Sequence, residues 1–338
     1  MLEDAEDYGS FYASVARPDT VVFPKNTVEV ATLVCDAILV GAKIVTRGYR
    51  HSMNGSTNVL PHSKSMVMNT TRMDSIEFGA SAGILVVGAG IQTQVLQQVL
   101  QQHNLFVCLP ETGKPSLGGY ICAGGPIPGP VAIWDYVQSI VIVDGCGNIH
   151  DVDRQCDIFP WLFGSSGQFG ILTQVVLRGS STAILKPIDR EAKAARVVWW
   201  SVIVGPDQLD LAVSALQVLQ SHFKSRLTFF DDYVYNLRLD SSIYPPLVLP
   251  TVHPLTTNTY YLCGIWTRNL QEKQTEIHEL EDEFAAMCRQ HKWKRYWQTE
   301  MVRLSLKLLE SQLSATAFQS YLVMKQRLDP NCIFEYIR

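Results

Sequence analysis

The chain has 338 residues, of which 47% are hydrophobic and 18% charged, a balance typical of a globular protein of about two domains. The formal net charge is −4 and no basic block is present, which argues against a nucleic-acid-binding protein. No apolar run approaches the ~20 residues of a membrane-spanning helix, and the acidic start Met1–Asp7 is unlike a signal peptide. We therefore expect a cytoplasmic protein without a membrane span, with secretion left open if a leader has been removed.

Short strands alternate with helices in the first half of the chain. Asn26, followed three residues later by Glu29, predicts a helix start, and apolar residues at helical spacing continue to Gly41. Asp144-Gly145 between two apolar runs predicts a hairpin turn. The expected strands are 43–46, Ser65–Asn69, Ile84–Gly88, Val137–Val143, Ile149–Val152 and Ile171–Leu177, and the further helices are Gln94–Gln102 and Gln155–Phe163.

The pattern changes after about residue 181. Strands are expected at Ala195–Val204, Leu227–Tyr235 and Thr257–Trp266, and helices from Pro206 to His222 and over Gln271–His291. Strand, helix, strand, strand, helix indicates an antiparallel sheet with helices on one face. Alternation along a strand sends Tyr260 and Tyr261 to opposite faces of that sheet.

The eight cysteines predict neither a metal site nor a disulfide framework. They form no Cys-x-x-Cys pair, no histidine cluster has metal-ligand spacing, and most cysteines lie in apolar runs where buried thiols are common. Asn54 and Asn69 each begin a glycosylation sequon, a short pattern that often occurs by chance.

Gly88-Ala89-Gly90 follows a strand and invites comparison with the dinucleotide-binding fingerprint. That fingerprint needs a third glycine at position 93, where this chain has Thr93. A strand that turns into a helix is the better interpretation, and an NAD-dependent enzyme is disfavoured.

Three other glycine-rich loops occur within about 130 residues, and each follows a strand. They are Arg47–Gly55, Leu109–Gly119 with its continuation to Gly125, and Asp157–Thr173. Glycine lets backbone approach a ligand closely, and successive exposed N–H groups form concave anion sites suited to a pyrophosphate. Each loop alone could be an ordinary turn, but together they indicate a nucleotide cofactor.

The order and spacing of these loops resemble the FAD domain shared by p-cresol methylhydroxylase, vanillyl-alcohol oxidase, berberine-bridge-type oxidases and cytokinin dehydrogenases. The third loop, with Gly167-Gln168-Phe169-Gly170-Ile171-Leu172-Thr173, is most similar to cytokinin dehydrogenases. The tail Lys325-Gln326-Arg327-Leu328-Asp329-Pro330 is similar to the family's Lys-x-x-x-Asp-Pro.

The resemblance implies an α+β fold in which a two-subdomain FAD-binding domain of the p-cresol methylhydroxylase type is joined to an antiparallel-sheet substrate cap. The FAD-binding domain would comprise 18–180, completed by 311–338, and the cap would comprise 181–310. The implied activity is that of an FAD-dependent oxidoreductase that takes hydride from an alcohol or amine and is reoxidised by dioxygen or another acceptor. The implied partner is a small organic molecule, and the oligomeric state stays open.

The resemblance also implies which residues hold the cofactor. His51 occupies the position that bonds covalently to the flavin in many relatives, while the alternative is a loop histidine satisfied by backbone hydrogen bonds. The cofactor-binding positions are Arg47, Gly48, Tyr49, Arg50, His51, Ser52, Ser116, Gly118, Gly119, Cys122, Gly125, Gly170, Ile171 and Leu172. Thr112 replaces the cysteine of bicovalent relatives, so a second covalent bond is not expected.

Two carboxylates are candidates for the catalytic base. A substrate that gives hydride to a flavin also loses a proton from oxygen or nitrogen, and a positioned carboxylate accepts it. Glu111 lies five residues before Ser116, where cytokinin dehydrogenases carry an aspartate, and Asp135 matches an Asp-x-Val element of the family. The alternative for Glu111 is an exposed loop carboxylate.

Some features depart from the family pattern. Arg50 replaces a glycine, the segment after Gly125 is rich in proline, and the chain ends soon after Asp329-Pro330. These departures leave a second hypothesis open, namely a degenerate relative that binds FAD weakly or not at all and serves as a non-catalytic binding protein.

Overall fold

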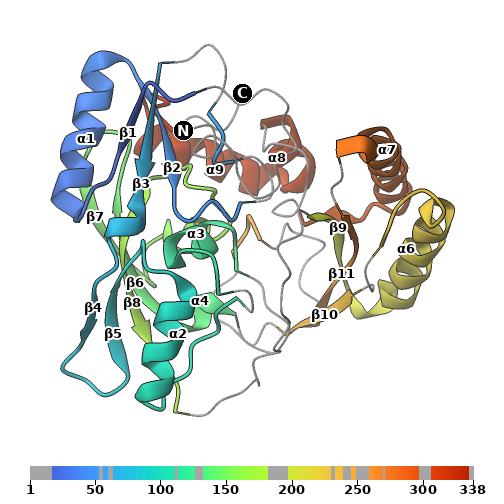
Figure 1. Cartoon of the computed structure of the whole chain (residues 1–338), viewed down its shortest axis with the longest axis horizontal. Helices are drawn as coiled ribbons and strands as arrows, with labels where there is room; N and C mark the ends of the chain where they lie inside the picture. The colour runs from blue at the N-terminus through green and yellow to red at the C-terminus, as the bar shows by residue number, and fades with distance from the viewer. Residues whose placement is uncertain are drawn as a thin grey trace.

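The protein was analysed as a computed structural model. It describes residues 17–52, 56–59, 64–110, 113–125, 132–181, 197–229, 233–238, 245–248, 259–268, 271–296 and 306–334. Helices and strands are mixed along the chain, and the strands form one parallel and two antiparallel sheets (Figure 1).

The first sheet has three parallel strands in the order β1-β3-β2. Helix α1 packs on it and begins as predicted, since the Asn26 side chain accepts a hydrogen bond from the Glu29 N–H and the helix ends at the left-handed Gly41. The C-terminal segment lies beside β2, because Ile44 pairs with Phe334 in a parallel bridge. The elements are β1 (Thr20–Val22), α1 (Thr27–Val40), β2 (Lys43–Arg47), β3 (Ser65–Asn69) and η1 (Thr70–Arg72).

The second sheet has five antiparallel strands in the order β4-β5-β8-β6-β7. The predicted hairpin is present as β6 and β7, joined by a turn in which Asp144 accepts hydrogen bonds from the N–H groups of Cys146 and Asn148. The strands are β4 (Ile76–Phe78), β5 (Ile84–Gly88), β6 (Val137–Val143), β7 (Ile149–Asp153) and β8 (Ile171–Arg178).

Gly88-Ala89-Gly90 lies at the end of an antiparallel strand, so the decision against a dinucleotide-binding crossover is confirmed. A Cβ on Gly90 would lie 1.8 Å from the carbonyl oxygen of Thr70, which explains this glycine by close backbone packing. Helix α2 (Thr93–Gln102) follows, and α3 (Leu117–Cys122) and α4 (Ile133–Tyr136) come later.

The helix predicted over Gln155–Phe163 is wrong in its first half, since α5 covers only Phe159–Leu162. The Asp153 carboxylate accepts the N–H groups of Gln155 and Cys156, at 2.9 and 3.2 Å. This local capping offers the backbone an alternative to helix.

The third sheet has four antiparallel strands in the order β10-β11-β9-β12. Within the strand predicted over Leu227–Tyr235, the described residues include an isolated bridge between Phe229 and Thr267 and the strand β10 from Tyr233. The elements are β9 (Val197–Val204), η2 (Pro206–Gln208), α6 (Leu209–Phe223), β10 (Tyr233–Arg238), β11 (Thr259–Arg268), η3 (Gln271–Lys273), α7 (Gln274–His291) and β12 (Lys294–Arg295).

The two faces of this third sheet belong to different hydrophobic clusters. Trp200, Val202 and Cys263 pack with α6 and α7, which cover the outer face (Figure 1). Tyr260 and Leu262 of β11 belong to the cluster that also contains β6 and β8 residues, while Tyr261 packs on the other side. The predicted alternation at positions 260 and 261 is therefore confirmed.

Trp199 and Trp266 also lie on the inner face of the third sheet. They are cross-strand partners and stack with ring centroids 4.9 Å apart. Both are only partly buried against the cluster shared with the second sheet.

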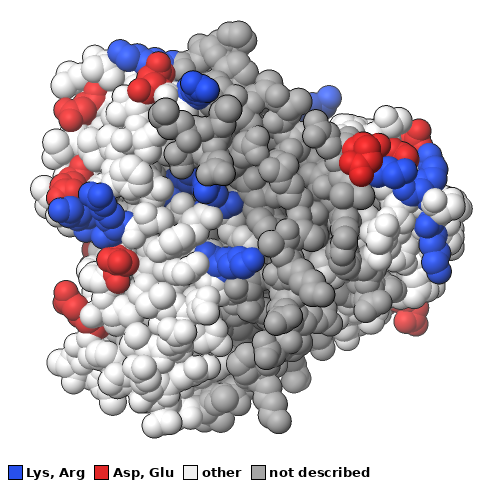
Figure 2. Space-filling model, in the orientation of Figure 1, with Lys and Arg blue, Asp and Glu red and all other residues white. Residues whose placement is uncertain are grey.

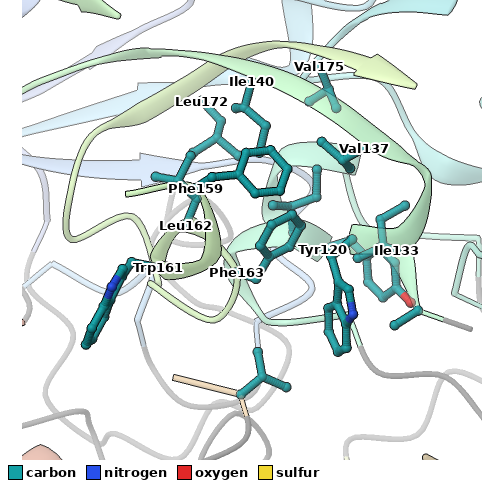
Figure 3. Close-up of a cluster of buried hydrophobic side chains, with 14 of the residues drawn as sticks. Tyr120, Ile133, Val137, Ile140, Phe159, Trp161, Leu162, Phe163, Leu172 and Val175 are labelled. Atoms are coloured by element: carbon teal, nitrogen blue, oxygen red, sulfur yellow. The ribbon is translucent and has the colours of Figure 1, made fainter. Parts of the chain in front are cut away.

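Helices α8 (Leu306–Gln312) and α9 (Ala315–Leu328) return the chain to the N-terminal sheets. Tyr321 of α9 is buried against Phe169 and Trp161. Figure 3 shows the adjoining aromatic core, in which Phe159 and Phe163 lie below Ile140 and Leu172 of the second sheet.

No helix within the described ranges is long and apolar enough to span a bilayer. All eight cysteines fall in those ranges as thiols. The same ranges contain no group of three or more His, Cys, Asp or Glu residues arranged to hold a metal ion. Figure 2 shows acidic and basic side chains interspersed over the described part of one face.

Candidate cofactor site

The first two glycine-rich loops meet at Gly48 and Ser116. A Cβ placed on Gly48 would lie 2.3 Å from Ser116 Oγ and 3.0 Å from Ser116 Cβ, so only glycine allows this approach without a shift. Gly48 follows β2, and Ser116 is the N-cap of α3, with Oγ accepting the Gly119 N–H at 3.2 Å. Loops separated by almost 70 residues thus come together, as the cofactor interpretation requires.

The start of α3 is fixed to the second sheet by backbone hydrogen bonds. The Gly118 N–H donates to Ala89 O at 2.7 Å and the Leu117 N–H donates to Ile91 O at 2.9 Å. A Cβ on Gly118 would lie 3.0 Å from both the Cβ and the carbonyl oxygen of Ala89. Gly118 is therefore required by close packing, whatever else the loop binds.

His51 lies where burial keeps its imidazole neutral. Desolvation, reinforced by the positive charge of Lys114, lowers the pKa of His51 from its ordinary value to about 4. Lys114 belongs to the second loop, so its effect on the pKa of His51 indicates that the two loops lie near each other. Sequence reasoning assigned no role to Lys114, because a lysine between glycine and proline has no distinctive pattern.

The residues on either side of His51 differ in their burial and in their hydrogen-bond partners. The Arg47 side chain is buried and donates to the Thr57 carbonyl, while Tyr49 is exposed. Ser52 Oγ lies 3.0 Å from Ser56 Oγ. Arg50 has φ +59°, in the left-handed region that favours glycine, so the structure places a cation where the backbone conformation suits the family's glycine.

The end of α3 connects the second and third loops. The Ser166 N–H donates to Cys122 O at 2.9 Å, and the Gly164 N–H donates to Ile121 O at 3.1 Å. Burial raises the pKa of the Cys122 thiol to about 11, although hydrogen bonds from Ser165 and Gly167 oppose the rise. Cys122 is therefore a neutral thiol near pH 7.

Gly124 and Gly125 both adopt positive φ, and Tyr120 Oη donates to Gly125 O at 2.8 Å. A Cβ on Gly125 would lie 2.8 Å from Ile133 Cγ2 and 2.9 Å from the Tyr120 ring. Residues 126–131, with the prolines noted in the sequence, lie outside the described residues.

The third loop leads directly into β8. Gly170 has φ +153°, and a Cβ there would lie 2.8 Å from Val143 O. Ile171 and Leu172 are paired with Val143 and Ile142 of β6. The sequence prediction that these three residues present backbone groups to a cofactor stays a prediction.

The two candidate bases differ in what the structure says of them. Glu111 lies outside the described residues. Asp135 is half-buried at the start of α4, and its Oδ2 accepts the Ala132 N–H at 2.8 Å. One carboxylate oxygen of Asp135 therefore has a structural partner.

Two residues outside the glycine-rich loops contact this region, and the sequence did not predict either: Tyr296, directly after β12, and Val248, in the turn before β11. Tyr296 Oη donates to Ala123 O at 3.1 Å, next to the glycine pair. A Cβ on Gly124 would lie 2.7 Å from Val248 Cγ2, and one on Gly164 would lie 3.0 Å from the same atom. Neither Tyr296 nor Val248 lies in a recognisable motif.

Comparison with known proteins agrees with this geometry. Residues 18–153 match a family model described as an FAD binding domain. The chain is 27% identical over 179 residues to an FAD-dependent monooxygenase of Fusarium proliferatum, a match covering 51% of this chain and 34% of the relative. It is 27% identical over 232 residues to an FAD-linked oxidoreductase of Aspergillus niger, covering 64% of this chain and 41% of the relative.

A third relative is the mitochondrial D-lactate dehydrogenase (cytochrome) of Arabidopsis thaliana, 25% identical over 180 residues, 50% of this chain and 31% of the relative. Each match spans less than half of the relative's length. Residues 18–153 thus match an FAD binding domain, and the chain is similar over part of its length to FAD-linked oxidoreductases.

Proposed function

We propose that this protein is an FAD-dependent oxidoreductase that removes hydride from the carbon of a small alcohol or amine. In this proposal residues 18–180 and 311–338 form a two-subdomain FAD-binding domain of the p-cresol methylhydroxylase type, and 181–310 form the substrate cap. The third glycine-rich loop supports a relation to cytokinin dehydrogenases within that class.

The observation that carries the proposal is the contact between Gly48 and Ser116. It joins the first two glycine-rich loops at a point where a side chain would not fit. The residues present suit a dinucleotide, because glycine at Gly48 and Gly119 keeps side chains out of the junction between the two loops, so that a cofactor can approach the backbone closely there. When bound, FAD supplies the hydride acceptor.

His51 is proposed to bond covalently to the flavin. A nucleophile must carry a free electron pair, and the lowered pKa of His51 keeps the imidazole neutral and nucleophilic above about pH 5. The positive charge of Lys114 that lowers this pKa would also favour negative charge on a neighbouring ring.

Glu111 is proposed as the base that accepts the substrate's proton, with Asp135 as the second candidate. The Asp135 carboxylate already accepts the Ala132 N–H, and that hydrogen bond restricts its orientation. The site for the substrate is proposed between the glycine-rich loops and the inner face of the third sheet, because Tyr296 and Val248 contact the loops and share a hydrophobic cluster with Tyr260 and Leu262 of that face.

The colour of the purified protein tests the proposal. An FAD oxidoreductase is yellow with a flavin absorbance band, whereas a colourless preparation that does not take up added FAD would favour the non-catalytic binding protein. Acid precipitation then tests the bond at His51, since covalently held flavin stays with the pellet.

The variant His51→Ala should release its flavin on acid treatment. The matched control is His222→Ala, which removes a histidine whose side chain is 58% exposed on α6. If flavin stays in the pellet with His51→Ala, or leaves wild-type protein on precipitation, the covalent bond at His51 is wrong while FAD binding can still stand.

A further inference from the structure

Asp329 is the most deeply buried carboxylate among the ion pairs of the described chain, with a side chain that is 0% exposed. It accepts hydrogen bonds from the Ile333 N–H at 2.7 Å, the Phe334 N–H at 3.2 Å and Lys325 Nζ at 2.6 Å. Three donors compensate for the burial of its charge. The Asp329 carboxylate therefore holds the C-terminal segment around Ile333 and Phe334 in place.

The segment that Asp329 holds lies directly against β2. Ile44 N–H donates to Ile333 O at 2.8 Å, and Ile44 pairs with Phe334 in a parallel bridge. Since β2 ends at Arg47, this contact supports the strand from which the first glycine-rich loop departs.

Lys325 connects the same carboxylate to the third glycine-rich loop. Its Nζ, on a side chain 15% exposed, donates both to Asp329 and to the carbonyl oxygen of Gln168 at 2.8 Å. Burial lowers the pKa of Lys325 from its ordinary value, and the Asp329 carboxylate opposes that change.

Ser166 and Gly164 fix the start of this loop to α3, but Gln168 itself has few other polar contacts. Gln168 is fully buried, and its side-chain Nε2 and Oε1 have no hydrogen-bond partner in the structure as described. Its N–H donates to Ser165 O at 3.0 Å, a contact within the loop itself. The Lys325 ammonium is therefore the polar contact that fixes Gln168 to another element.

We propose that Lys325 and Asp329 are positioning residues for the cofactor-binding loops. Asp329 holds the C-terminal segment against β2, from which the first glycine-rich loop departs, and Lys325 holds Gln168 of the third loop. The inference rests on the proposed FAD function but assigns a role that the glycine motifs themselves do not carry. An ion pair at the end of α9 would thus control the affinity for FAD without touching the cofactor.

The test is Lys325→Met in the full chain, with hydrogen–deuterium exchange and FAD titration as readouts, the titration being made in the His51→Ala background so that no covalent bond to the flavin forms. Peptides covering 47–52 and 165–172 should exchange faster, and the dissociation constant for FAD should rise at least about tenfold, the loss expected for one buried charged hydrogen bond of about 1.5–3 kcal/mol. Peptides of β11 should exchange at the wild-type rate.

The matched control is Arg327→Met, two residues along the same helix. Arg327 pairs with Asp157, the first residue of the third loop, at 3.1 Å, but the two side chains are 50% and 64% exposed, so this pair should contribute little and the control compares an exposed ion pair to the loop with the buried one. Asp329→Asn is the second variant, because it removes the charge and keeps an oxygen for one backbone N–H if Lys325→Met does not fold.

Faster exchange over the whole chain, or unchanged exchange in both loops, would overturn the positioning role. Wild-type protein that binds no FAD would instead overturn the proposed function. The exchange measurement still decides the role of the ion pair in that case, so the two failures are distinguishable.

Discussion

The N-terminal region and the third sheet carry different kinds of information in their sequences. In residues 18–153 several glycines are required by close contacts, such as Gly48 against the Ser116 side chain and Gly90 against Thr70 O. In the third sheet, apolar residues alternate along the strands of an antiparallel ladder and pack on two different clusters. Loops that pack this closely need glycine at particular positions, whereas the third sheet needs only apolar residues in alternation.

The largest expected effect tests whether the chemistry belongs to the N-terminal region. Glu111→Gln keeps the shape of the side chain and removes the proton acceptor, so flavin reduction should slow by about 10²–10⁴-fold while FAD remains bound. Rapid-mixing absorbance at the flavin band measures this rate.

Asp135→Asn is the companion variant, and it should have the smaller effect because one Asp135 oxygen already accepts the Ala132 N–H. A wild-type rate in Glu111→Gln would eliminate that base. A wild-type rate in both variants would indicate that the base lies on the third sheet. That result would contradict the assignment of the chemistry to the N-terminal region.

The second prediction concerns glycine in the two regions. Gly48→Val should lower the free energy of unfolding by about 2–4 kcal/mol, because Ser116 must move and its cap on α3 is lost. FAD affinity should fall with it. Chemical denaturation and FAD titration measure the two effects.

The control is Gly205→Ala, at the entrance to η2 in the third-sheet region. The nearest atom to its added Cβ would be Asp207 Oδ1, the end of a side chain that can turn away. If both variants cost the same stability, the special role assigned to Gly48 is mistaken.

The smallest effect is the pH dependence contributed by His51. Its folded-state pKa of about 4 lies below the ordinary value of 6.5, so the unfolded chain binds the extra proton first as pH falls. The contribution of His51 to the free energy of unfolding is therefore largest above about pH 6.5 and decreases as the pH falls towards 4.

The measurement is the difference in unfolding free energy between wild type and His51→Ala across that range. We expect it to fall by about 1–2 kcal/mol, allowing for the partial exposure of the side chain. A difference that is constant with pH would show that the imidazole protonates as readily in the folded protein as in the unfolded chain.

Much of the fold follows from the sequence because its features are local. Asn26 caps α1 and Gly41 ends it as predicted, and β3 and β5 have their predicted bounds. The helix before Phe159 was overpredicted because the competing Asp153 cap is a local contact that helical spacing does not reveal.

The candidate site is predictable only in part. The sequence motifs identify Gly48, His51 and Ser116, but the contact between their loops depends on how distant segments pack. Lys114 and Tyr296 were missed for the same reason, since their importance comes from neighbours more than 60 residues away in the chain.

The stacked pair of Trp199 and Trp266 gives this protein an internal optical reporter. Two indoles held 4.9 Å apart on paired strands couple their electronic transitions, so their near-ultraviolet circular dichroism depends on the register of β9 and β11. That signal disappears when tertiary packing is lost even if secondary structure remains. Because indole emission overlaps flavin absorption, the quenching of this pair would also report how far the third sheet stands from a bound flavin.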